Sequence, residues 1–186
     1  MKKLRIGVDI DSVVNDLSAA VLEVYNEDSG DNLTISDITD YMIEKFVKPE
    51  YKESFHKYFV DKRVWKRIKP INIKAVQWLI DNHDVYFVTA TEIENLEPKK
   101  RWLLKHFTNI DLRKRLVRLY DKQLFSCDFL IDDSIKNLNG THDYISVCID
   151  MPYNQGFNNC LRFKTVQDFV DFFFLEKTLW SYQEHP

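Results

Sequence analysis

The chain has 186 residues, 45% of them hydrophobic and 30% charged, an ordinary composition for one globular domain or for a domain with an insert. Its formal net charge of −3 excludes the overall basic field that would draw it to duplex nucleic acid. The three cysteines have no paired spacing, so we expect no disulfide framework and no zinc site. No apolar run approaches the roughly 18 residues of a membrane span, so we expect a cytoplasmic protein with no membrane partner.

The first predicted element is a strand that ends in two acids. Residues 4–10 are apolar at every second position, which is typical of a strand, and Asp9 and Asp11 stand at its end. In an open α/β sheet, ligands bind outside the carboxyl ends of the strands. Two carboxylates there can hold a cation and do chemistry, because one can attack phosphorus while the other moves a proton. A strand end exposed to solvent explains the pair equally well.

A helical region separates this strand from the next. Residues 16–28 have the apolar spacing of a helix, which Gly30 is expected to end. In the polar and aromatic stretch 31–70 we expect one helix over 36–46 and another over 49–60. This stretch carries the aromatic residues Tyr41, Phe46, Tyr51, Phe55, Tyr58, Phe59 and Trp65. For any one of them, a place in a small aromatic core is the more common explanation than contact with a ligand.

From residue 70 onward, strand and helix patterns alternate. Strands are expected over 84–90, 116–120, 127–133 and 144–150, and helices over 72–83, 98–107 and 134–138 and after residue 165. Such alternation is typical of βαβ units, which form a parallel sheet covered by helices. The sequence therefore predicts an α/β fold.

Several of the predicted strands end in polar residues of compatible chemistry, namely Asp9, Asp11, Thr89, Asp132 and Asp133. In a parallel sheet these ends lie at one edge, where clustered carboxylates repel one another unless a cation sits among them. Ligation by oxygen alone suits Mg²⁺. Lys122, just before the strand that ends in the paired acids, can supply a positive charge, although a single lysine taken alone is more often a surface residue.

The order of these residues resembles that of the four motifs of the haloacid dehalogenase (HAD) superfamily of phosphotransferases. The matching residues are Asp9 and Asp11, then Thr89, then Lys122, then Asp132 and Asp133. A closer resemblance is to the 5′(3′)-deoxyribonucleotidases, through Val13-Val14-Asn15-Asp16, the spacing from Lys122 to the paired acids, and the loop Pro152-Tyr153-Asn154-Gln155. The chain departs from this family at Ser12, Leu17 and Ala90, where glycine, an aromatic residue and serine are common.

The resemblance implies a fold and an activity. The fold would be a HAD-like Rossmannoid parallel sheet with helices on both faces, formed by residues 1–16 and 71–186, with residues 17–70 as a helical cap inserted after the first strand. The activity would be that of a Mg²⁺-dependent phosphomonoesterase, a 5′(3′)-deoxyribonucleotidase that hydrolyses (deoxy)nucleoside monophosphates to nucleoside and phosphate through an aspartyl-phosphate.

The same resemblance implies a role for each residue. Asp9 would be the nucleophile, and Asp11 would protonate the leaving oxygen and then activate water. Mg²⁺ would bind Asp9, the backbone carbonyl of Asp11 and Asp133, with Asp132 as an indirect or alternative ligand. The phosphoryl group would contact Thr89, Ala90 and Lys122, and the cap would contact the base and sugar through Tyr41 and Trp65. Asn137 would orient one of the paired acids or simply occupy the first turn of its helix.

Other functions remain open. The same chemistry could act on a sugar phosphate, a phosphorylated cofactor or a nucleic-acid end, or the chain could bind nucleotides without turnover. A phosphoacceptor domain like that of response regulators would not need the insert at 31–70. The four glycines form no phosphate-binding loop, which excludes the P-loop and dinucleotide interpretations. The histidines form no His-Glu-x-x-His pattern, which argues against a zinc hydrolase. The sequence leaves open whether the chain forms a homodimer.

Overall fold

A parallel sheet lies at the centre of the computed structural model, which describes residues 3–173. Within these residues the sheet has six strands in the order β3-β2-β1-β4-β5-β6, and all neighbours are parallel. The strands are β1 (Arg5–Val8), β2 (Asp84–Thr89), β3 (Leu116–Arg118), β4 (Phe129–Asp132), β5 (Ile145–Ile149) and β6 (Leu161–Phe163). The predicted α/β fold is confirmed, and β6 is a strand that the sequence patterns did not indicate.

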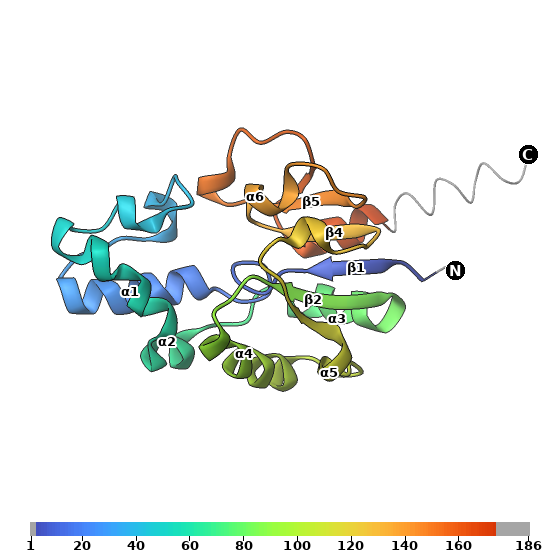
Figure 1. Cartoon of the computed structure of the whole chain (residues 1–186), viewed down its shortest axis with the longest axis horizontal. Coiled ribbons are helices and arrows are strands. Elements are labelled where there is room, and N and C mark those ends of the chain that lie inside the picture. The colour runs from blue at the N-terminus through green and yellow to red at the C-terminus, as the bar shows by residue number, and fades with distance from the viewer. Residues whose placement is uncertain (1–2, 174–186) are drawn as a thin grey trace, which may run out of the picture.

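Helices pack on both faces of this sheet (Figure 1). They are α3 (Ile73–Asn82), α4 (Ile93–His106), α5 (Leu112–Arg115) and α6 (Ile135–Leu138), followed by a helix that starts at Val166. In Figure 1, α3 lies behind the strands. None of the helices described between residues 3 and 173 has the length and apolar character needed to cross a membrane.

The strand order creates a crevice beside β1. The chain leaves β1 to form β2 and β3 on one side, and later returns to form β4, β5 and β6 on the other. The order therefore reverses between β1 and β4, which is where open α/β sheets bind ligands. The Asp9 backbone N–H donates to the Ile131 carbonyl at 2.9 Å, so the ladder between the two strands extends to the first acid.

The connection from β1 to α3 contains helices and loops but no strand, and we call its residues 17–70 the helical segment. It contains α1 (Leu17–Ser29), a 3₁₀ helix (Pro49–Val60) and α2 (Lys62–Arg67). Gly30 ends α1 in the left-handed conformation, with φ of 65°, as its position in the sequence predicted. In Figure 1 the helical segment lies beyond the carboxyl ends of the strands.

The helical segment has an aromatic core of its own. The ring of Tyr25 on α1 meets those of Tyr51, Phe55 and Tyr58 nearly edge to face, at centroid distances of 5.4, 5.6 and 5.9 Å. Such pairs contribute about 0.5–1.5 kcal/mol beyond the area they bury. Several of the predicted aromatics therefore stabilise this segment and do not face a ligand.

The prediction of a helix over residues 36–46 is wrong. The chain forms only two short 3₁₀ turns there, Ile35–Asp37 and Ile43–Lys45. The Asp37 carboxylate accepts hydrogen bonds from the backbone and hydroxyl of Thr34, at 2.8 and 2.7 Å, and Asp40 accepts one from the Met42 backbone at 2.9 Å. Such local side-chain bonds offer the backbone an alternative to the helix, which explains the interruption.

The helix predicted to begin at Pro98 begins instead at Ile93, so the proline lies inside α4. A proline in this position cannot donate to the carbonyl four residues earlier and costs the helix one hydrogen bond. The longer helix places Asn95 and Lys99 four residues apart on one face, where both are buried. This face is turned toward the crevice.

Two connections join the helical segment to the sheet, and they run side by side. The Asp16 backbone N–H donates to the Lys69 carbonyl at 3.1 Å, and that of Ile71 donates to the Val14 carbonyl at 2.9 Å. The Asn72 amide donates to the Val13 carbonyl at 2.9 Å. These bonds hold the segment against the end of β1.

Candidate active site

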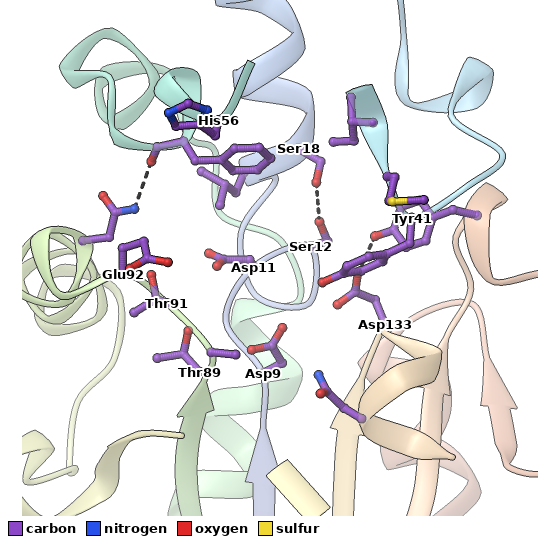
Figure 2. A pocket seen from close by; sticks show the side chains of 18 of the residues that line it. Asp9, Asp11, Ser12, Ser18, Tyr41, His56, Thr89, Thr91, Glu92 and Asp133 are labelled. Carbon is purple, nitrogen blue, oxygen red and sulfur yellow. Dashed lines mark hydrogen bonds between the residues drawn. The ribbon is translucent and has the colours of Figure 1, made fainter. Parts of the chain in front are cut away.

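A cavity of about 530 Å³ lies between the strand ends and the helical segment. Its walls include the predicted residues Asp9, Asp11, Tyr41, Thr89, Ala90, Lys122 and Asp133. Figure 2 shows Asp9 low in the cavity, with Thr89, Thr91 and Glu92 on one side and Asp133 and Tyr41 on the other. The volume falls within the range of about 300–1,000 Å³ that small-molecule sites occupy.

Lys122 joins two of the acids. Its Nζ lies 2.6 Å from Asp9 Oδ1 and 2.7 Å from Asp132 Oδ2, and the side chain is 1% exposed. Burial lowers the pKa of Lys122, but attraction to Asp132 and Asp9 outweighs this effect and raises it above its usual value. The ammonium group therefore stays charged beside Asp9.

The acids that surround this lysine repel one another. Burial raises the pKa of Asp9 to about 7; Lys122 opposes the shift, while Asp132 and Asp11 add to it. Burial, together with the charges of Asp132 and Asp9, also raises the pKa of Asp133 above its usual value. A cation among these carboxylates would relieve their repulsion and favour their ionised forms.

The two acids at the carboxyl end of β4 have different surroundings. Asp132 Oδ1 accepts bonds from the Ser134 backbone at 2.8 Å and the Asn137 amide at 3.1 Å, and Oδ2 accepts from Lys122 and Asn137 at 2.7 and 3.0 Å. Asp133 lines the cavity, and its Oδ2 accepts a bond from the Tyr153 hydroxyl. Because the Asp132 oxygens are already engaged, Asp133 is the better placed of the two to bind an ion.

The acidic cluster fits a hard divalent cation. Carboxylate oxygens of Asp9, Asp132 and Asp133 lie within 4.8 Å of one another. The donors are all oxygen atoms, which suits Mg²⁺. When all four carboxylates are ionised, Asp11 included, the ammonium groups of Lys122 and Lys99 balance two of the four negative charges, and one divalent ion would balance the other two.

The sequence patterns did not single out Lys99 as a residue of this cluster. Its side chain is fully buried, its Nζ pairs with Asp11 Oδ2, and the same atom donates to Thr89 Oγ1 at 3.2 Å. Residues 97–101 are mostly charged, which is typical of an exposed helix face and does not indicate a buried lysine. Placing the start of α4 at Ile93 would have shown that Asn95 and Lys99 share a face.

The helical segment supplies one of the two side chains predicted for it and two that were not predicted. The structure brings Tyr41 to the cavity but not Trp65, which is half-buried in α2 and packs against the main hydrophobic core. His56 and Phe59 line the cavity instead, and Figure 2 shows His56 at its far end from Asp9. The Asn95 amide donates to the Phe59 carbonyl at 3.0 Å and joins this wall to α4.

Two serines shape the loop after Asp11. Ser12 adopts the left-handed backbone conformation, with φ of 61°, and its hydroxyl lies 3.0 Å from that of Ser18 at the start of α1. Figure 2 shows this pair next to Asp11. A residue other than glycine in this conformation carries strain of about 1–3 kcal/mol, which the surrounding contacts must offset.

Comparisons with known proteins find similar sequences. A family model described as 5′ nucleotidase, deoxy (pyrimidine), cytosolic type C protein matches residues 2–179. A 5′(3′)-deoxyribonucleotidase from Clostridium acetobutylicum is 28% identical over 164 residues, which cover 87% of this chain and 90% of that protein.

Solved structures share the fold. A haloacid dehalogenase-like hydrolase from Streptococcus pneumoniae superimposes with a TM-score of 0.60 at 10% identity, over 92% of this chain and 98% of its own. A HAD hydrolase from Bacillus subtilis, solved bound to magnesium, gives 0.56 at 13% identity, over 92% and 99%. These likenesses identify the fold as HAD-like.

Proposed function

Because this chain belongs to the family of cytosolic type C deoxy(pyrimidine) 5′ nucleotidases and is thus a HAD-type phosphoric monoester hydrolase, we propose that it hydrolyses deoxyribonucleoside monophosphates in the cytoplasm. The observation that carries the proposal is the arrangement around Asp9. Its carboxylate faces the cavity, is paired with the buried Lys122, and lies next to Asp11 and Asp133. The relative from Clostridium acetobutylicum supports the choice of substrate.

Asp9 is the proposed nucleophile. Its carboxylate oxygen would form a bond to phosphorus while the ester oxygen leaves, which produces an aspartyl-phosphate and the free nucleoside. Lys122 keeps Asp9 in place, and with Thr89 it faces the position where charge develops on the phosphoryl oxygens. The Ala90 backbone lies beside Thr89 at the same wall.

Asp11 is the proposed general acid and base. It would give a proton to the leaving oxygen in the first step, and take one from the water that attacks the aspartyl-phosphate in the second. Lys99 holds its carboxylate through an ion pair, and Asn15 contacts the other oxygen at 3.4 Å. Asp11 is therefore fixed above Asp9 and open to the cavity, as Figure 2 shows.

Asp9, Asp133 and the backbone carbonyl of Asp11 are the proposed ligands of Mg²⁺. When bound, the ion would neutralise these carboxylates and polarise the phosphoryl oxygens. Asp132 is proposed to act indirectly, because Lys122, Asn137 and the Ser134 backbone already occupy its oxygens.

We further propose that the helical segment acts as a cap over the leaving group, with residues 1–16 and 71–186 as the catalytic core. Tyr41, His56 and Phe59 from this segment line the cavity opposite Asp9, where a base and sugar would lie. A cap in this position would exclude water from the reacting group, and its cavity-lining side chains would select the substrate.

Phosphate release from a panel of monoesters tests the function. The panel contains deoxyribo- and ribonucleoside monophosphates, a hexose phosphate and p-nitrophenyl phosphate, each assayed with Mg²⁺ and with a chelator. We expect the highest kcat/KM for a deoxyribonucleotide and loss of activity with the chelator. If the hexose phosphate is hydrolysed faster than every nucleotide, the nucleotide proposal is wrong while the phosphatase assignment stands.

Asp11→Asn should lower kcat for nucleotides by about 10²–10⁴-fold, the usual contribution of general acid–base catalysis. Because p-nitrophenolate leaves without a proton, p-nitrophenyl phosphate should still release one equivalent of phenol in a rapid burst before slow turnover. Stopped-flow absorbance measures the burst. The substitution changes only the side chain and leaves the backbone carbonyl of residue 11 available as a ligand, so Mg²⁺ should still bind. Loss of both the burst and Mg²⁺ binding would contradict the assigned role.

Phe59→Ala and Trp65→Ala separate contact with a substrate from packing. If Phe59 stacks on a base, its removal should weaken substrate binding by about 1–3 kcal/mol and raise KM for nucleotides about 5-fold or more. KM for p-nitrophenyl phosphate, which has no base, should rise less. Trp65→Ala should leave the KM ratio of the two substrates unchanged and lower Tm. Equal KM changes for both substrates in Phe59→Ala would remove Phe59 from the base site.

A further inference from the structure

The loop between β5 and β6 holds Asp133 from two directions. The Tyr153 hydroxyl donates to Asp133 Oδ2, while the Asn154 amide donates to the Asp133 carbonyl at 2.8 Å and to the Ile149 carbonyl at 2.8 Å. Both residues belong to one 3₁₀ turn, Pro152–Asn154. The side chain and the backbone of Asp133 are therefore positioned by neighbouring residues of the same turn.

The loop is itself braced by Arg162 on β6. One guanidinium nitrogen pairs with Asp150 and donates to Asn154 Oδ1 at 3.1 Å, and the other donates to the carbonyls of Asn154 and Phe157 at 3.0 and 2.6 Å. Asn154 is fully buried. A hydroxyl at the end of a rigid ring on a braced turn has little freedom, so its target oxygen is well defined.

Asp133 differs from its three acidic neighbours in the charge of its partner. Asp9 and Asp132 pair with Lys122, and Asp11 pairs with Lys99. Among the described residues, no lysine, arginine or histidine forms an ion pair with Asp133, whose side chain bonds the neutral Tyr153 hydroxyl. A neutral donor can orient a carboxylate without cancelling the charge that attracts a cation, and it engages one oxygen while the other is left for the ion.

Tyr153 also contacts the helical segment. The ring of Tyr41 meets the ring of Tyr153 edge to face, at a centroid distance of 5.8 Å and an interplanar angle of 80°. Figure 2 shows Tyr41 above Asp133 on the same side of the cavity. The aromatic pair is thus a direct connection from the helical segment to the acidic cluster.

We propose that Tyr153 is a positioning residue that orients the Asp133 carboxylate for a divalent cation, and that Tyr41 holds the Tyr153 ring in place. The inference rests on the proposed function only in taking Asp133 as a cation ligand. Partners that orient a ligand typically contribute about 10- to 100-fold to metal affinity. Tyr41 acts here through its ring, whether or not it also touches a substrate.

Titration calorimetry with Mg²⁺ alone tests the proposal in the absence of any substrate. Tyr153→Phe keeps the ring and removes only the hydroxyl, and we expect about 10- to 100-fold weaker Mg²⁺ binding with an unchanged Tm of the metal-free protein. Tyr41→Ala should weaken binding by a smaller factor. Tyr51→Phe is the matched control, because its hydroxyl donates to the Asp28 carbonyl at 2.9 Å away from the cavity.

Wild-type affinity for Mg²⁺ in Tyr153→Phe would overturn the proposal. A lowered Tm of the metal-free variant that accounts for the weaker binding would do the same, because it would indicate a structural role. Unchanged affinity in Tyr41→Ala would remove the contribution of the helical segment. The titration uses no nucleotide, so failure of the nucleotide panel would leave its result standing.

Discussion

Asp9→Asn is expected to lower the rate of phosphate release from nucleotides by about 10⁴-fold or more, the scale of loss seen when a covalent nucleophile is removed. An amide oxygen does not attack phosphorus at a useful rate, so no aspartyl-phosphate would form. The amide also loses the ion pair with Lys122 and is a weaker ligand for a cation. Nucleophilic attack and cation binding would therefore fail together.

Single-turnover and steady-state phosphate release would measure this effect. Asp128→Asn is the matched control, because Asp128 lies at the opposite end of β4, where its carboxylate accepts a bond from the Arg5 backbone at 2.7 Å. This control should keep wild-type kinetics. Circular dichroism would check that both variants fold. Near-full turnover in a folded Asp9→Asn protein would contradict the assignment of the nucleophile.

Lys122→Met should lower both activity and stability. It leaves Asp9 and Asp132 buried without their positive partner, and breaking a buried ion pair in this way typically costs about 3–5 kcal/mol. Turnover should fall strongly because the phosphoryl group loses the same charge. Lys122→Arg should rescue poorly, since a planar guanidinium does not fit where a compact ammonium bridges two carboxylates.

Denaturant unfolding with and without Mg²⁺ would separate the two effects of Lys122→Met. The added ion should stabilise the variant more than the wild type, because it replaces part of the missing positive charge. Lys100→Met is the matched control, since Lys100 lies on α4 outside the cavity and should change neither quantity. Unchanged kinetics in Lys122→Met would move the phosphate-binding role to Lys99.

Most of the sheet was predictable because its central strands are short apolar runs with polar ends. The runs before Asp9, Thr89 and Asp133 form β1, β2 and β4 and bring these residues to one crevice. Strand β6 was missed because Leu161–Phe163 has three residues with a charged one at the centre, and it forms only by pairing with β5. The pattern of short edge strands is too weak to detect in isolation.

The helical segment was harder to predict, because its local signals competed. Its aromatic content predicted a ligand wall, yet the sequence could not distinguish Phe59, which faces the cavity, from Phe55, which is fully buried in the packing around Tyr25. The predicted role of Trp65 and the helix start predicted at Pro98 were also wrong, each because its local signal is ambiguous. A ligand-facing aromatic and a core aromatic have the same composition and spacing, and a proline marks a helix start more often than a helix interior.

The chemistry of the site and its place at the strand ends could be inferred from the order of residues along the chain, because parallel strands bring their carboxyl ends together whatever lies between them. The partner of each charged group could not be inferred from that order. Lys99 reaches Asp11 across 88 positions, and Tyr153 reaches Asp133 across 20. The different surroundings of Asp132 and Asp133 likewise depend on α6 and the loop after β5. A side chain's hydrogen-bond partner is set by which distant segments pack against it, and that packing exists only in the folded chain.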